Sequence, residues 1–246
     1  NALARQLQDI GVKPGAHVGV YIKRSTDLMV GALAVLKTGA AYVPLDPAYP
    51  RDRIAHYLSD SQASVVVTQE ALRPDLPTTQ AKIVTVDSLT VDNLPTSEAL
   101  TTNVSSAATG ADLAYLIYTS GTTGHPKGAC LSHRNILLNV AMTALMHQRS
   151  DRDTVVTALP CPHVYGNVVM SGAIQNGMTL VLHPAFEEAT ILQSIQDHKA
   201  TLFEGVPTMY MFMLNHPEFD AYDLSSLRCC TVGGQTMPVP KMEEVE

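Results

Sequence analysis

The chain has 246 residues, with 16 lysines and arginines against 23 aspartates and glutamates, and its formal net charge is −7. Charged residues make up 16% of the sequence and hydrophobic residues 46%, a balance typical of a folded globular protein. Such a chain has no surplus positive charge with which to neutralise a nucleic-acid backbone, which excludes nucleic acid as the main partner. The longest apolar run, Met29–Leu36, is too short for a membrane span, which needs ~20 residues.

The spacing of the cysteines restricts the kinds of site that the chain can form. Cys130, Cys161, Cys229 and Cys230 form no CxxC pair, which argues against a zinc ribbon or a thioredoxin-like site. Scattered thiols are typical of a reducing compartment, so we expect a cytoplasmic location, with peripheral attachment to a membrane left open. No signal-peptide pattern follows Asn1, and the helical pattern there is already under way, so we expect the native N-terminus to lie further upstream.

Short β-branched runs alternate with helical patterns, which predicts an α/β fold with mainly parallel sheet. Helices are expected over residues 1–10, 26–37, 51–59, 135–147, 187–198 and from 238 to the end. Strands are expected over residues 17–22, 63–68, 83–86, 113–118, 153–158, 177–182, 200–204 and 229–232. Polar residues 88–112 and residues 119–128 are expected to form loops.

The strongest functional pattern is the loop over residues 119–128, which follows a hydrophobic strand and reads TSGTTGHPKG. Glycines let the backbone approach a ligand closely, and successive N–H groups can form an anion-binding nest. Lys127 adds a positive charge suited to phosphate. The spacing GxxGxxKG differs from that of the P-loop, GxxxxGK[ST]. By composition alone, a solvated surface loop is as good an interpretation as a polyphosphate site.

Four segments, taken in order, resemble the motifs of one known family. They are residues 36–47, LKTGAAYVPLDP; 118–128, YTSGTTGHPKG; 159–166, LPCPHVYG; and 227–237, LRCCTVGGQTM. Over nearly its whole length the chain therefore resembles the AMP-forming adenylating superfamily, which contains acyl-CoA synthetases, adenylation domains of nonribosomal peptide synthetases and firefly luciferase.

The resemblance implies the large N-terminal domain of that family, with two α/β lobes, ending before its β-barrel part and its C-terminal lid. One lobe is expected at about residues 36–145, and the other is expected to combine residues 1–35 with residues 146–246. The family's catalytic lysine and its other later motifs would then lie beyond residue 246. No catalytic residue is therefore expected within this chain, which we expect to show little or no adenylation by itself.

In this family a carboxylate attacks the α-phosphorus of ATP, pyrophosphate leaves, and a thiol then takes the acyl group from the adenylate. The resemblance implies ATP, Mg²⁺ and CoA as cofactors and a small-molecule carboxylic acid as substrate. It implies ATP binding by Thr119, Ser120, Gly121, Thr122, Thr123, Gly124, Lys127, Gly234, Gln235 and Thr236, with the Thr123 hydroxyl on the Mg²⁺ side. It places His163, Tyr165, Gly166 and Gly233 on the acyl or CoA path.

Two features leave the function within the family open. Peptide-synthetase modules carry a Phe-Asp pair that marks an amino-acid substrate where this chain has Pro162-His163, which favours an acyl-CoA synthetase for fatty or other apolar acids. The segment 42–47, YVPLDP, is shared with peptide-synthetase modules, so an amino-acid adenylation domain is the alternative. A non-catalytic nucleotide-binding fragment is a further one. By its residue type alone, His163 is more simply a histidine satisfied by local hydrogen bonds.

Overall fold

The computed structural model describes residues 1–88, 102–119 and 126–245, and the chain divides into two compact units, residues 1–137 and 138–246. The first unit contains α1 (Ala2–Asp9), β1 (His17–Tyr21), α2 (Thr26–Lys37), β2 (Ala41–Pro44), α3 (Arg51–Asp60), β3 (Val65–Thr68), η1 (Glu70–Asp75), β4 (Lys82–Thr85), η2 (Val86–Ser88), β5 (Leu113–Thr119) and β6 (Lys127–Ser132). The boundary falls inside α5 (His133–Met146).

The second unit continues from α5 with the same alternation of strands and helices. It contains β7 (Thr154–Thr157), α6 (Val164–Asn176), β8 (Thr179–Leu182), α7 (Glu188–Asp197), β9 (Leu202–Gly205), α8 (Pro207–Leu214), η4 (Phe219–Ala221), β10 (Cys229–Val232) and α9 (Val239–Val245). The predicted α/β class with parallel sheets is confirmed. In the described part of the chain no helix combines the length and the hydropathy needed to cross a membrane.

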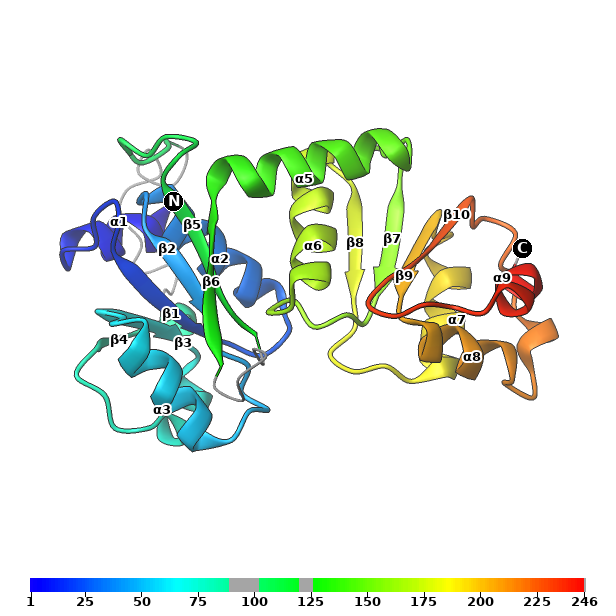
Figure 1. Ribbon diagram of the computed structural model, residues 1–246, viewed down its shortest axis with the longest axis horizontal. Coiled ribbons are helices and arrows are strands. Elements are labelled where there is room, and N and C mark those ends of the chain that lie inside the picture. The colour runs from blue at the N-terminus through cyan, green and yellow to red at the C-terminus, as the bar shows by residue number, and fades with distance from the viewer. Residues whose placement is uncertain (89–101, 120–125, 246) are drawn as a thin grey trace. The chain divides into compact units, whose positions relative to one another are not determined.

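The sheet of the first unit has the strand order β4-β3-β1-β2-β5-β6, in which only the β5–β6 pair is antiparallel (Figure 1). Its two faces are covered by different helices. On one face Gly31 of α2 approaches the side chains of Val20 and Val67. On the other, Gly19 of β1 lies against Leu58 of α3. Small residues at these crossings let the helices pack closely on the strands.

The expected lobe division is wrong for residues 1–35. β1 pairs with β2 and with β3 inside the first sheet, and α1 packs against α2, so these residues belong to the first unit. The physical reason is that β1 is almost wholly buried and central, so both of its edges need a strand to satisfy their backbone groups.

The second unit is built on a four-stranded parallel sheet with the order β10-β9-β7-β8 (Figure 1). One face of this sheet packs against Ile191 and Ile195 of α7 and the apolar side chains of α8. The opposite face packs against Val169 and Ala173 of α6. A bidentate ion pair, from Arg228 before β10 to Asp153 before β7, joins the two segments at distances of 2.9 and 2.7 Å.

Candidate functional site

The two ends of the glycine-rich loop are paired across an antiparallel hairpin. Thr119 ends β5 and Lys127 begins β6, and these two exposed residues are cross-strand partners. Behind them, the Tyr118 ring stacks on Tyr57 with centroids 4.0 Å apart, and its hydroxyl donates to Asp60 at 2.6 Å. The strand that leads into the loop is therefore held firmly by α3.

Five of the residues expected to bind ATP lie outside the described residues. They are Ser120, Gly121, Thr122, Thr123 and Gly124. Their contacts with phosphate, and that of Thr123 with Mg²⁺, stay predictions. Within the described residues, no three His, Cys, Asp or Glu side chains gather into a group that could hold a metal ion.

The segment PCPHVYG forms a tight turn that starts α6. The His163 amide donates to the carbonyl of Pro160 at 2.9 Å, and the His163 side chain caps the helix by accepting a bond from the Tyr165 amide at 3.3 Å. A Cβ on Gly166 would overlap the Pro160 carbonyl oxygen and lie 2.6 Å from its carbonyl carbon. Only glycine fits there without movement of the backbone. The capping bond fits the simpler interpretation of His163, that of a locally satisfied histidine.

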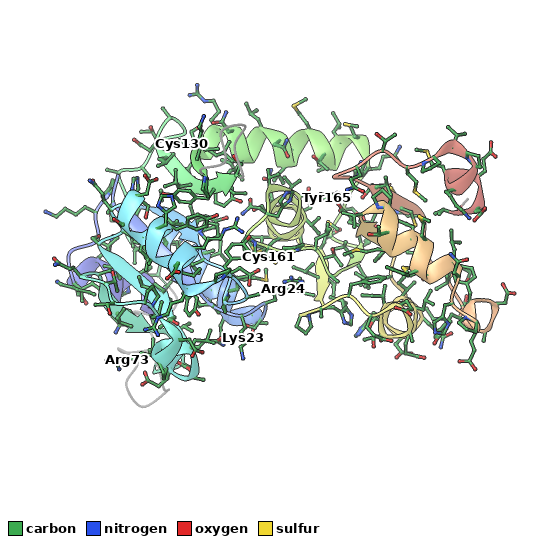
Figure 2. The ribbon with its side chains drawn as sticks, turned by 60° about the horizontal axis from the view of Figure 1, so that its bottom comes forward. Lys23, Arg24, Arg73, Cys130, Cys161 and Tyr165 are labelled. Atoms are coloured by element: carbon green, nitrogen blue, oxygen red, sulfur yellow. The ribbon has the colours of Figure 1, made fainter. Side chains whose placement is uncertain are left out.

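Tyr165 brings the third and fourth motif segments together (Figure 2). Its hydroxyl lies 3.1 Å from the carbonyl and from the side-chain oxygen of Thr231 on β10. Its ring leaves no room for a side chain at Gly233, where a Cβ would lie 2.7 Å from the ring. Burial raises the pKa of Tyr165 to about 12, so the hydroxyl stays protonated and can donate. Gly234 follows with φ of +82°, the left-handed region that glycine adopts freely.

These contacts form one wall of a pocket of about 310 Å³ that lies entirely within the second unit. Its lining residues come from α5 and the residue after it, from α6, from β9, and from β10 and the residue after it: Asn139, Thr143, His147, Val164, Tyr165, Val168, Glu204, Thr231, Val232 and Gly233. The pocket thus includes Tyr165 and Gly233 of the expected acyl path. The described lining does not include His163, Gly166, Gly234, Gln235 or Thr236.

A buried ion pair borders this pocket. The Arg149 Nη2 donates to Glu204 Oε1 at 2.5 Å, and their side chains are 0% and 1% exposed. Burial raises the pKa of Glu204, which the Arg149 guanidinium and a hydrogen bond to Thr231 oppose. Burial, with the Arg149 charge, lowers the pKa of His147, whose Nδ1 lies 3.1 Å from Arg149. None of these three residues was predicted from the sequence. The one feature of the sequence that pointed to them was the charged residue Glu204 inside the buried strand Leu202–Gly205.

Comparison with known proteins places the chain. A family model described as "AMP-binding enzyme" matches residues 1–246. The chain is 34% identical to tyrocidine synthase 3 of Brevibacillus parabrevis over 99% of this chain and 4% of that protein. It is 32% identical to a long-chain-fatty-acid–CoA ligase of Bacillus subtilis (strain 168) over 99% of this chain and 50% of that protein.

A solved structure shows a similarity of the same kind. The nonribosomal peptide synthetase FmoA3 in its AMPPNP-bound form superimposes with a TM-score of 0.88 at 25% identity, covering 99% of this chain and 26% of that one. The chain therefore spans half or less of the length of these relatives. Its four motif segments, its two α/β units and the match along its whole length agree. The chain belongs to the family of AMP-binding enzymes.

Proposed function

We propose that the protein activates a carboxylic acid other than an α-amino acid and passes it to the thiol of CoA. In the first step the carboxylate oxygen bonds to the α-phosphorus of ATP, and the bond to pyrophosphate breaks, which leaves an acyl adenylate. In the second step the CoA sulfur bonds to the acyl carbon and AMP leaves. The membership in the AMP-binding family supports the first step.

The observation that carries the choice of acid is the charge balance of the pocket. An α-amino acid brings an ammonium group, which needs a free carboxylate when it is buried. Among the described lining residues the one carboxylate is Glu204, and Arg149 already neutralises it. An acid without a charged amino group therefore suits this pocket better.

The loop over residues 119–128 is the proposed phosphate site. Lys127 would supply charge, and the loop amides and hydroxyls would supply donors, to the phosphates of ATP. Mg²⁺, when bound, would offset phosphate charge that develops as pyrophosphate leaves. The catalytic contribution of such groups is positioning and charge stabilisation, since the reaction needs no nucleophilic side chain.

An amino-acid adenylation domain is the second candidate. The segment 42–47 favours it, and so does the similarity to tyrocidine synthase 3. In that case the acyl acceptor would be a carrier-bound thiol in place of CoA. It would also require that Glu204, despite its partner Arg149, serves as the counter-ion of the substrate ammonium group.

The test is acid-dependent exchange between pyrophosphate and ATP, followed by thioester formation with CoA, in the protein expressed from its complete reading frame. Alkanoates, hydroxy acids, benzoate and amino acids form the panel. Lys127→Ala should lower exchange by about 100-fold, the typical cost of one lost transition-state donor. Lys13→Ala, an exposed lysine of the same unit, is the control and should leave exchange unchanged. Exchange with amino acids alone, or equal rates in both variants, would overturn the proposal.

A further inference from the structure

Thr119 and Lys127, the described residues at the two ends of the proposed phosphate loop, lie past the strand pairing that anchors β5 in its sheet. In the described part of the chain, the register of β5 on β2 is set at one position, where Tyr42 pairs with Tyr115. Thr119 ends β5 four residues after Tyr115, and its cross-strand partner is Lys127 at the start of β6. The place of the hairpin end must therefore be fixed by side chains.

The Tyr118 side chain supplies such an anchor. Its ring stacks on the buried ring of Tyr57 in α3, with centroids 4.0 Å apart and 11° between the planes, and its hydroxyl donates to Asp60 Oδ2 at 2.6 Å. Burial, together with that bond, raises the pKa of Tyr118, so the hydroxyl keeps its proton at neutral pH. The ring also lies beside the second strand, since a Cβ on its cross-strand partner Gly128 would be 3.6 Å from it.

Asp60 stands where helix formation alone would not place an aspartate. It is the last residue of α3, and a negative charge there opposes the helix dipole, whose negative end is the carboxyl end. Asp52, in the first turn of the same helix, is at the favourable end. Asp60 is exposed, so core packing does not require it either. What this position gains is the bond from Tyr118.

The first motif segment, residues 36–47, supports the rest of β5. Val43 of this segment belongs to the same buried cluster as Tyr118. The ring of Tyr42 lies against that of Tyr115, with centroids 5.0 Å apart. The segment thus holds the middle of the strand, and α3 holds its end.

We propose that Tyr118, held by Asp60, is the positioning residue of the phosphate site: it fixes the hairpin end so that Lys127 meets the phosphates of ATP. This inference rests on the proposed function, because it takes residues 119–128 as the phosphate site. It gives Tyr118 no contact with the nucleotide. The lysine charge sits on a long flexible side chain, and it stabilises phosphate charge only when its backbone is in the right place.

The test measures pyrophosphate exchange, and Mg–ATP binding by calorimetry, in the protein expressed from its complete reading frame. Tyr118→Phe removes the hydroxyl and keeps the ring. It should lower kcat/KM for ATP by about 10-fold, or ~1.4 kcal/mol, the value of one hydrogen bond, and leave KM for the acid unchanged. Asp60→Ala removes the same bond and should have the same effect. Asp60→Asn keeps an acceptor oxygen and should stay within about threefold of the parent.

Urea unfolding separates positioning from a purely structural role. Asp60→Ala also removes a charge that opposes the helix dipole, and alanine favours the helix, so its urea midpoint should stay near the parental value while exchange falls. The control is Thr68→Val, which removes a buried hydroxyl that donates to the Tyr21 carbonyl at 2.8 Å in the same unit. It should lower the midpoint and keep exchange.

A double-mutant cycle tests whether Tyr118 acts through the phosphate site. When Tyr118→Phe is added to Lys127→Ala, kcat/KM for ATP should fall by less than about threefold further, in place of the 10-fold fall in the parent. Residues that act independently would give effects that multiply.

The outcomes separate the inference from the proposed function. If Lys127→Ala loses exchange, then parental exchange in Tyr118→Phe, exchange that follows the urea midpoint across the variants, or effects that multiply in the cycle overturn the inference alone. Unchanged exchange in Lys127→Ala overturns the phosphate site and the inference with it. If no acid gives exchange, the proposed function fails. Weaker Mg–ATP binding in Tyr118→Phe and Lys127→Ala, with parental binding in Thr68→Val, then still supports the inference, and equal or absent binding in all of these proteins overturns it.

Discussion

Replacement of Gly166 by alanine tests whether the third motif segment is a structural turn. Gly166 lies in the first turn of α6, shortly after the capping residue His163. A methyl group there would overlap the carbonyl oxygen of Pro160 and lie 3.0 Å from the amide nitrogen of Cys161. These neighbours are backbone atoms of a buried turn, so they cannot move aside as the end of a flexible side chain would.

The size of the effect follows from two opposing contributions. Alanine in place of glycine inside a helix stabilises by about 0.5–1 kcal/mol. Overpacking against fixed atoms costs typically 1–3 kcal/mol, and contact with a rigid carbonyl falls at the upper end. The net loss of unfolding free energy should be about 2 kcal/mol, which corresponds to a fall in Tm of roughly 4–8 °C. Any relief by movement of α6 would displace Tyr165 from Thr231 and so alter the pocket.

Urea unfolding with circular dichroism measures the stability, and pyrophosphate exchange measures the function. The control is Gly110→Ala in the first unit, where the nearest atom to a new Cβ is 3.6 Å away, and this variant should be as stable as the parent. A Gly166→Ala variant with parental Tm and parental exchange would refute the steric argument. Loss of exchange at unchanged Tm would instead make Gly166 a ligand-contacting position.

Three further outcomes are expected. Arg228→Met should destabilise by about 1–3 kcal/mol at neutral pH, since it leaves the buried Asp153 with fewer donors. Burial raises the pKa of Asp153, but the bonds from Arg228 and Thr201 outweigh it and hold that pKa below its usual value. The stability they confer is therefore complete above pH ~4 and is lost as the pH falls through the folded pKa, so unfolding curves of parent and variant should converge in acid. Tyr165→Phe should cost about 1 kcal/mol in urea unfolding, because it removes the bond to Thr231; an unchanged midpoint would contradict this. Gly172→Ala should lower the free energy of unfolding by about 1–3 kcal/mol, since a Cβ there would lie 2.7 Å from Nη1 of Arg149 and the buried pair with Glu204 would have to move; an unchanged urea midpoint would contradict this.

Elements with strong local patterns were predictable from the sequence. α2 matches the expected residues 26–37 and β10 matches residues 229–232. In α2 the helix begins directly after Ser25, whose side chain makes no capping hydrogen bond, and it ends before Gly39, which has φ of +81°, so local chemistry sets its C-terminal end. Here propensity, periodicity and termination agree, which is the condition for a local prediction to succeed.

Two strands and two α-helices were not anticipated, each for a physical reason. β2 (Ala41–Pro44) ends in proline, which disfavours a central strand because it has no N–H group to donate. The strand is nevertheless buried, and it pairs with β1 on one side and β5 on the other. β6 (Lys127–Ser132) has exposed residues and a glycine, and only its pairing with β5 makes it a strand. α6 and α8 are uniformly apolar or rich in glycine, so they lack the 3.6-residue period that marks a surface helix.

The candidate site also contains residues that the sequence predicted and residues that only the fold brings together. The resemblance to the family pointed to Tyr165 and Gly233, and the structure brings them into contact. Glu204 and Arg149 could not be paired from the sequence, because 55 residues separate them and no local pattern connects them. A charged residue in a buried strand indicates that an ion-pair partner exists, but only the fold identifies that partner.

The glycines of these motifs show why a motif alone does not assign a ligand contact. At Gly166 and at Gly233, a side chain is excluded by the protein's own atoms, namely the Pro160 carbonyl and the Tyr165 ring. Substitution of either glycine would therefore impair function whether or not a ligand touches it. What distinguishes the two cases is the effect of a substitution: at a glycine needed for packing, stability falls together with exchange, whereas at a glycine that contacts the ligand, exchange falls alone.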